Sequence, residues 1–285
     1  MTTIDILEET YAALSANKIR SGLTMLGIVI GIGSVIAMVS IGQGAQSSIT
    51  DRISSIGSNL IMVSPGQQRG VGVMVSGGRG TAKTLTQADA DAITKEVENV
   101  EAVAPENSGR YQVTAKGTNT NTSVVGTTPA YTSVRNLEVE DGSFITEQQV
   151  TSRSKVAVIG PTVATDLFPN ETGSVVGKTI RIKGMEFKVI GVTKAKGGTG
   201  FGSQDDMIYV PLSSAQRYLA GSTYVTSISI QAVSADLMAT VQESITALLM
   251  ERHKITDSTK ADFSVINQAD IVATASSVTS TFTTL

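Results

Sequence analysis

SGLTMLGIVIGIGSVIAMVSIGQGAQSSIT, which is Ser21–Thr50, contains no charged side chain, and this stretch decides the fold. Within it, Leu23–Ile41 is apolar apart from Thr24, Ser34, Ser40 and the glycines. At a helical rise of about 1.5 Å per residue this segment is roughly 29 Å long, which is close to the thickness of the hydrocarbon core of a bilayer. The sequence therefore predicts a membrane-spanning helix.

The residues around this segment predict its orientation and its retention. Lys18 and Arg20 precede it, whereas Arg52 after it is balanced by Asp51. Basic residues favour the cytoplasmic side, so we expect a cytoplasmic N-terminus in the inner or plasma membrane and an extracytoplasmic main domain. The apolar core exceeds the about 7–15 residues of a signal peptide, which favours an anchor at 21–42 over a cleaved leader.

Helical periodicity continues on both sides of the predicted span. Residues 1–20 form an amphipathic pattern, expected as a cytoplasmic helix lying either on the membrane surface or on a partner. Residues 43–58 are expected as a helical stalk, and 269–285 as a returning stalk helix that is truncated before a second span. The candidate packing residues of the stalks recur at helical spacing; they are Ile49, Ile53, Ile56, Ile271, Val278 and Phe282.

A pair of small residues lies inside the predicted span. Gly27 and Gly31 are four residues apart and therefore share one face of a helix. Small residues at this spacing allow a second helix to approach closely. These two glycines are the candidate helix-packing residues of the span.

The rest of the chain predicts an α+β domain divided in sequence. Strand and helix patterns at 59–128 and 219–268 resemble two βαβ-like units, expected to form one porter-like α+β domain. Short strands and turns at 129–218 are expected as an inserted, β-rich lobe. In the first unit, separate strands are expected near 100–105 and 110–116, after a helix from Thr86 to about Glu98 that opens with a capping box.

Composition argues against several classes of function. The formal net charge is −3 with no basic stripe, which disfavours nucleic-acid binding, and there is no cysteine for a disulfide, a zinc site or a thiol nucleophile. The single histidine, His253, is expected to complement the dipole of a helix C-terminus. Pairs of carboxylates are expected to be solvated, at Asp89/Asp91, Glu138/Glu140/Asp141 and Asp205/Asp206.

The glycine-rich strings do not form a nucleotide site. They lie at 27–33, 70–80 and 196–202, and none is followed by the Lys-Ser/Thr of a phosphate-binding loop. We therefore expect no catalytic residue, no cofactor and no metal, and a chain that is not itself an enzyme.

Several long strings resemble one family. LSANKIRSGLTMLGIVIGIGSVIAMVSIGQGAQ (Leu14–Gln46) resembles the first span of MacB-type ABC transporter permeases, which belong to the FtsX-like group. Three further strings resemble the periplasmic core domain of that family; they are VAVIGPTVATDLF (156–168), VGKTIRIKGMEFKVIGV (176–192) and DMIYVPLSSAQRYL (206–219). This resemblance implies a permease with four spans and a large exported domain between the first and the second.

The resemblance also implies a function and partners. Such permeases couple cytoplasmic ATP hydrolysis to movement outside the membrane for export or efflux, so the implied partners are a cytoplasmic ABC ATPase subunit, a second permease copy and a periplasmic adaptor. Two alternatives stay open: an FtsX-like regulator of an extracytoplasmic cell-wall hydrolase, and a stand-alone membrane-anchored binding domain. The sequence does not identify a cargo.

Overall fold

The computed structural model describes residues 17–56, 59–66, 83–171, 173–197 and 203–268. The chain divides into two units: residues 1–52 together with 272–285, and residues 53–271. The predicted N-terminal helix at 1–16 and the returning stalk at 269–285 lie outside the described residues. Each unit is treated by itself below.

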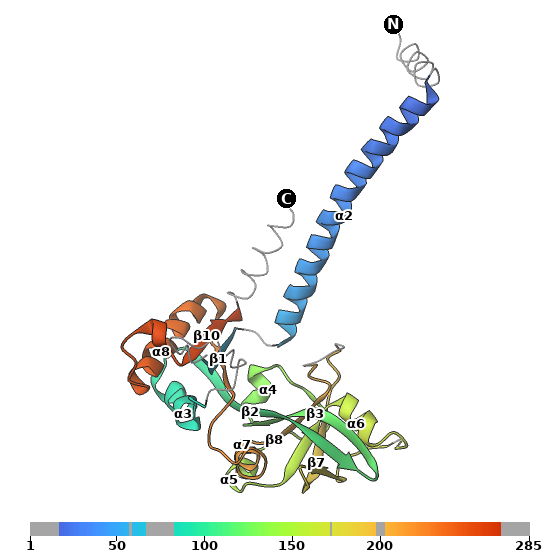
Figure 1. Ribbon diagram of the computed structural model, residues 1–285. Helices are drawn as coiled ribbons and strands as arrows, with labels where there is room; N and C mark the ends of the chain where they lie inside the picture. Colours follow the sequence, from blue (N-terminus) through green and yellow to red (C-terminus); the bar gives the residue numbers. More distant parts are fainter. Residues whose placement is uncertain (1–16, 57–58, 67–82, 172, 198–202, 269–285) are drawn as a thin grey trace, which may run out of the picture. The chain divides into compact units, whose positions relative to one another are not determined.

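One long helix, α2 (Lys18–Ile56), continues without interruption for 39 residues, and all but its last four residues belong to the first unit (Figure 1). Its segment Lys18–Gly44 is long and apolar enough to cross a membrane. The apolar side chains there are exposed, as expected for a helix that meets lipid rather than a protein core. Residues 21–42 of the predicted span and residues 43–56 of the predicted stalk lie on this one helix, and 57–58 lie outside the described residues.

The second unit is a mixed α+β structure built on a ten-stranded sheet. Its helices of four or more residues are α3 (Gln87–Glu96), α4 (Tyr131–Val134), α5 (Glu147–Thr151), α6 (Pro161–Leu167) and α8 (Met238–Arg252). Shorter helical turns are α7 (Leu212–Ser214), η2 (Ala235–Leu237) and η3 (Ser258–Lys260), and η1 (Ala215–Ala220) is a π-helix. The strands are β1 (Leu60–Pro65), β2 (Val100–Ala115), β3 (Thr118–Thr127), β4 (Val139–Gly142), β5 (Val156–Ile159), β6 (Thr179–Ile182), β7 (Met185–Thr193), β8 (Met207–Pro211), β9 (Ser227–Ala232) and β10 (Phe263–Asn267).

Four strand segments form an antiparallel layer in the order β10-β1-β9-β2, to which β2 contributes its first half, Val100–Glu106. Alternate side chains point to one face, where they pack against α3 and α8. Ile61 and Val63 of β1 and Ile228 and Ile230 of β9 are fully buried there. We refer to these four segments and two helices as the helix-backed layer.

The second half of β2 belongs to a closed barrel. Asn107–Ala115 pairs with β3, and the pairing continues through β8, β5, β7 and β6. The ring closes where β6 pairs with β2, through Val113↔Ile182 and Thr114↔Arg181. Every second residue of these strands points inward, so that Val113, Ile180 and Phe187 fill the interior.

A third apolar core joins the barrel to the helix-backed layer. It contains Leu60 of β1 and Ala104 of β2 from the second face of the layer, and Val125 and Val158 from the outer wall of the barrel. The turns around α4 and α5 fill the space between them. Strand β2 therefore runs through both parts, and Figure 1 shows it as one long strand.

The structure differs from the sequence predictions in several details. The two strands expected near 100–105 and 110–116 are one strand of 16 residues, because Pro105–Gly109 continues the extended backbone that pairs first with β9 and then with β3. Helix α3 ends at Glu96 rather than near Glu98. The buried face of α8 includes Val241, Ile245 and Leu249, for which no prediction is made above.

Both strands of the β2–β3 hairpin contribute to the barrel, although they precede residue 129. The division into a porter-like domain and an inserted lobe stays a prediction.

Candidate functional site

The predicted helix-packing residues lie together on α2. Gly27 and Gly31 are one helical turn apart, and a Cβ atom added at either would meet no atom within 4 Å. The Ser34 hydroxyl donates a hydrogen bond to the Gly31 carbonyl oxygen at 2.8 Å, so that this polar group is satisfied within the helix. The face that carries the two glycines is therefore open to a further helix, and its use for packing stays a prediction.

The predicted stalk residues are only partly within the description. Ile49, Ile53 and Ile56 lie on the helical backbone of α2, at spacings of four and three residues. The side chains of these three residues are outside the description. Ile271, Val278 and Phe282 also lie outside the described residues.

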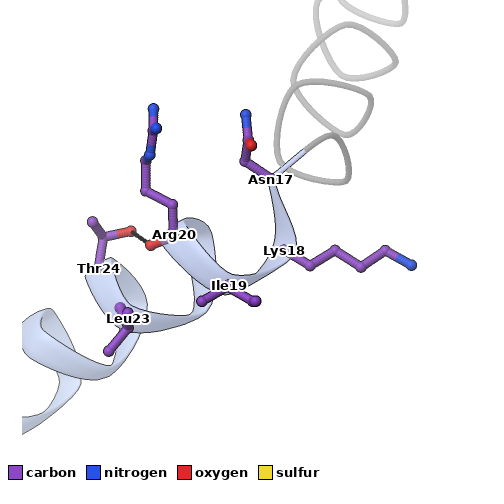
Figure 2. Close-up of a pocket in the computed structure, with 6 residues that line it drawn as sticks. All are labelled: Asn17, Lys18, Ile19, Arg20, Leu23 and Thr24. Carbon is purple, nitrogen blue, oxygen red and sulfur yellow. Dashed lines mark hydrogen bonds between the residues drawn. The ribbon is translucent and has the colours of Figure 1, made fainter.

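The first turns of α2 line a shallow hollow (Figure 2). Its lining residues come from one stretch of chain: Asn17, Lys18, Ile19, Arg20, Leu23 and Thr24. The Thr24 hydroxyl hydrogen-bonds the carbonyl oxygens of Arg20 and Ser21, at 3.1 and 3.0 Å. Figure 2 shows the Lys18 and Arg20 side chains extending away from each other, so they do not converge on one ligand.

A buried polar cluster lies where β2 passes from the helix-backed layer into the barrel. Arg135, which follows α4, donates from a terminal guanidinium nitrogen to Glu106 Oε1 of β2 at 3.0 Å. The Ser229 hydroxyl of β9 forms a short hydrogen bond to the same oxygen. Only 12% of the Arg135 side chain and 8% of the Glu106 side chain are exposed. We call Glu106, Arg135 and Ser229 the polar joint.

Two tyrosines line the polar joint. The rings of Tyr131 and Tyr209 are 5.3 Å apart, and the guanidinium carbon of Arg135 lies 5.9 Å from the centre of the Tyr131 ring. Burial, together with the Glu106 charge, raises the pKa of both tyrosines well above the ordinary value. Burial lowers the pKa of Arg135, but the charge of Glu106, its hydrogen bond and the two tyrosines together outweigh burial and raise that pKa. Arg135 therefore keeps its charge inside the protein.

The prediction that the paired carboxylates are solvated is wrong for Asp89. Its residue is 4% exposed, and its carboxylate accepts hydrogen bonds from Thr86 N (2.9 Å), Thr86 Oγ1 (2.8 Å) and Arg252 Nε (2.9 Å). Burial raises the pKa of Asp89, but the bonds from Thr86 and Arg252 outweigh it and hold the pKa below its ordinary value. Asp89 thus ties the beginning of α3 to the end of α8.

His253 lies at the C-cap of α8 and contacts two carboxylates, and its predicted role of complementing the helix dipole stays a prediction. Its backbone N–H donates to the Leu249 carbonyl oxygen at 2.9 Å. Its Nδ1 lies 2.8 Å from Asp262 Oδ1, and its Nε2 lies 3.5 Å from Asp89 Oδ2. The sequence pattern missed these contacts because Asp89 and Asp262 are distant from each other in the chain.

Asp205 is also buried, contrary to the prediction. It is 8% exposed, and its two carboxylate oxygens accept the backbone N–H groups of Lys196 and Gly197 at 2.9 and 3.0 Å. Lys196 Nζ in turn donates to the Arg135 carbonyl oxygen at 2.8 Å. The first two residues of the glycine-rich string at 196–202 therefore bind a carboxylate of the protein itself through their backbone N–H groups. Residues 198–202 lie outside the described residues.

Within the described ranges, no group of three or more His, Asp or Glu side chains is arranged to hold a metal ion. The polar groups described above pair with one another and join elements of the fold. The architecture defines the chain as an α+β domain of extracytoplasmic type, attached to a candidate membrane helix. The chain belongs to the MacB-like periplasmic core domain family, whose pattern it matches over residues 21–248.

Related proteins of known sequence support this assignment. The chain is 39% identical over 283 residues to "Macrolide export ATP-binding/permease protein MacB" of Bdellovibrio bacteriovorus, and 35% identical over 282 residues to the protein of the same name in Marinobacter nauticus. These matches cover 99% of this chain but only 43% and 42% of the two relatives. The matched portion is the permease and periplasmic part, without the ATPase domain.

Solved structures share the fold. The periplasmic region of MacB from Actinobacillus actinomycetemcomitans superposes with a TM-score of 0.64 over 80% of this chain and 97% of that one, at 24% identity. The extracellular domain of the ABC-type transporter YknZ from Gram-positive bacteria gives a TM-score of 0.59 over 73% of this chain and 100% of that one, at 22% identity. At these identities the likeness establishes the fold alone.

Proposed function

We propose that this chain is part of the permease subunit of a MacB-like ABC transporter, and that it transmits an ATP-driven change in the cytoplasm to an extracytoplasmic domain. The observation that carries the proposal is the continuity of α2, which runs for 39 residues and extends beyond its membrane-spanning segment. A helix without a break transmits rotation and displacement along its axis, whereas a flexible linker does not.

The proposal extends to the partners and to the division of the extracytoplasmic domain, with family membership as support. ATP hydrolysis is assigned to a separate cytoplasmic ABC ATPase subunit, and the permease is assigned a second copy of itself and an adaptor outside the membrane. Segments 59–128 and 219–268 are proposed as the porter-like part and 129–218 as the β-rich lobe, with the β2–β3 hairpin shared between them. Export or efflux is the proposed outcome, and no cargo is assigned.

The experiment is co-purification of the complete permease with an ABC ATPase subunit encoded in the same genome, in a lipid nanodisc. We expect a stable complex in which ATP changes the proteolysis pattern or the label environment of the extracytoplasmic unit. A matched ATPase variant that binds ATP but does not hydrolyse it separates the effect of binding from that of turnover. Absence of a complex, together with an unchanged extracytoplasmic unit, would contradict the proposal.

A further inference from the structure

The helix-backed layer and the barrel each have their own core, and in the described residues the chain passes between them at two places. The chain crosses between them within β2, at Glu106–Asn107, and again between η1 and β9. The two parts also share the apolar core that contains Leu60, Ala104, Val125 and Val158, and Thr127 Oγ1 of β3 donates a hydrogen bond to the Pro105 carbonyl oxygen of β2 at 3.2 Å. Apolar contacts are not directional, so this core alone allows the two parts to shift relative to each other.

The polar joint adds a directional, charged contact to this apolar core. Glu106 lies at the crossing point of β2, Ser229 lies in the layer, and Arg135 follows α4, which lies in the core between the two parts. Arg135 is also held from its own side, through Lys196 Nζ on its carbonyl oxygen and through Tyr131 beneath its guanidinium group. A hydrogen-bonded ion pair therefore connects three elements of the two parts at one buried point.

A buried ion pair is a poor source of stability, because desolvation of the two charges offsets their attraction. Apolar residues of similar volume at such positions often give equal or greater stability, and in some proteins the buried polar group instead fixes a unique geometry. We propose that the polar joint fixes the orientation of the barrel on the helix-backed layer, so that the two parts move as one body. The inference does not depend on the transport function.

Distances between two spin labels test the proposal, because the chain contains no cysteine of its own. Ala247→Cys on α8 and Thr165→Cys on α6 place one label on each part, at exposed positions. In the full chain in nanodiscs we expect one narrow distance distribution. In the double variant Glu106→Leu/Arg135→Met we expect a distribution at least twice as wide, while the urea midpoint stays at or above that of the parent.

A matched control removes the exposed pair Glu138–Lys194, whose side chains are 61% and 62% exposed, through Glu138→Leu/Lys194→Met. This control is expected to leave both the distance distribution and the midpoint unchanged. A narrow, parent-like distribution in Glu106→Leu/Arg135→Met would overturn the proposal, and so would equal widening in the control.

The variant Ser229→Ala tests the same proposal if the double variant does not fold. It removes only the hydroxyl that reaches Glu106 from the layer and keeps both charges. We expect a distribution wider than that of the parent, with the midpoint lowered slightly. An unchanged distribution in a folded Ser229→Ala protein would contradict the proposed role of the joint.

Discussion

Asp89 shows how one residue can join two helices. Substitution Asp89→Asn removes the charge that Arg252 Nε contacts at 2.9 Å and weakens the bonds from Thr86. Since a buried donor then loses its charged partner, we expect the free energy of unfolding to fall by about 1–3 kcal/mol at pH 7. The measurement is urea unfolding, with the exposed Asp91→Asn on the same helix as the control.

The same residue predicts a pH dependence. The folded state holds the pKa of Asp89 below 3.8, so it binds fewer protons there than the unfolded state. The stabilisation is therefore fully present above about pH 4 and is lost as the pH falls through the lower, folded pKa. The measurement is the free energy of unfolding of the parent and of Asp89→Asn between about pH 3 and pH 7. The difference between the two proteins is expected to shrink at the acid end. A constant difference would mean that charge is not the cause.

Gly126 of β3 marks a close approach within the barrel. A Cβ atom at this position would lie 2.2 Å from the Cβ of Ala215 in η1. Gly126→Ala is therefore expected to lower the free energy of unfolding by about 1–3 kcal/mol through overpacking. Gly173→Ala, where an added Cβ meets no atom within 4 Å, should change it little. Thermal unfolding of the two variants compares them directly.

At the scale of elements, the continuity of α2 predicts different effects of two insertions. Seven alanines after Gly44 add about two helical turns and keep the following residues on nearly the same face. Seven glycines of the same length interrupt the helix, because glycine disfavours helix by about 1 kcal/mol per residue relative to alanine. In the complex with the ATPase, we expect ATP to alter the extracytoplasmic unit in the alanine variant and not in the glycine variant.

Periodic patterns predicted the elements that depend on local sequence. The charge-free run predicted the membrane segment of α2, and the capping pattern of Thr86 and Asp89 predicted the beginning of α3. The burial of Asp89 and Asp205 could not be predicted in this way, because Arg252 and the Lys196 backbone reach them from other elements. The Glu106–Arg135 pair was missed for the same reason, since its members are 29 residues apart. One observable hint was the second of two glutamates, Glu101 and Glu106, in an otherwise strand-like stretch at 100–106.

At the scale of the whole molecule, the three cores predict cooperative unfolding of residues 53–271. The third apolar core contains residues of both the helix-backed layer and the barrel, so unfolding of either part exposes this core. We expect the loss of helix in α3 and α8, followed by far-ultraviolet circular dichroism, to coincide with exposure of the buried Tyr131 and Tyr209, followed by their fluorescence. Two separate transitions would show that the parts unfold independently.

The proposed topology predicts which residues a membrane-impermeant thiol reagent reaches. In spheroplasts, Glu98→Cys in the second unit should react, whereas Asn17→Cys before α2 should react only after the membrane is permeabilised. Both positions are exposed and neither substitution removes the Lys18 or Arg20 charge that favours the orientation. Labelling of Asn17→Cys in intact spheroplasts would reverse the proposed orientation.

The continuity of strand β2 through both parts limits how homologous sequences can recombine, in engineered chimaeras and in evolution. The first half of β2 completes the helix-backed layer, and its second half completes the barrel. Exchange of either part for that of a homologue, with the junction between the parts, therefore cuts this strand. Chimaeras of this family should therefore tolerate recombination at the surface turn between Ala115 and Thr118, and fail at crossovers inside β2. Viable natural hybrids are expected to inherit this strand from a single parent.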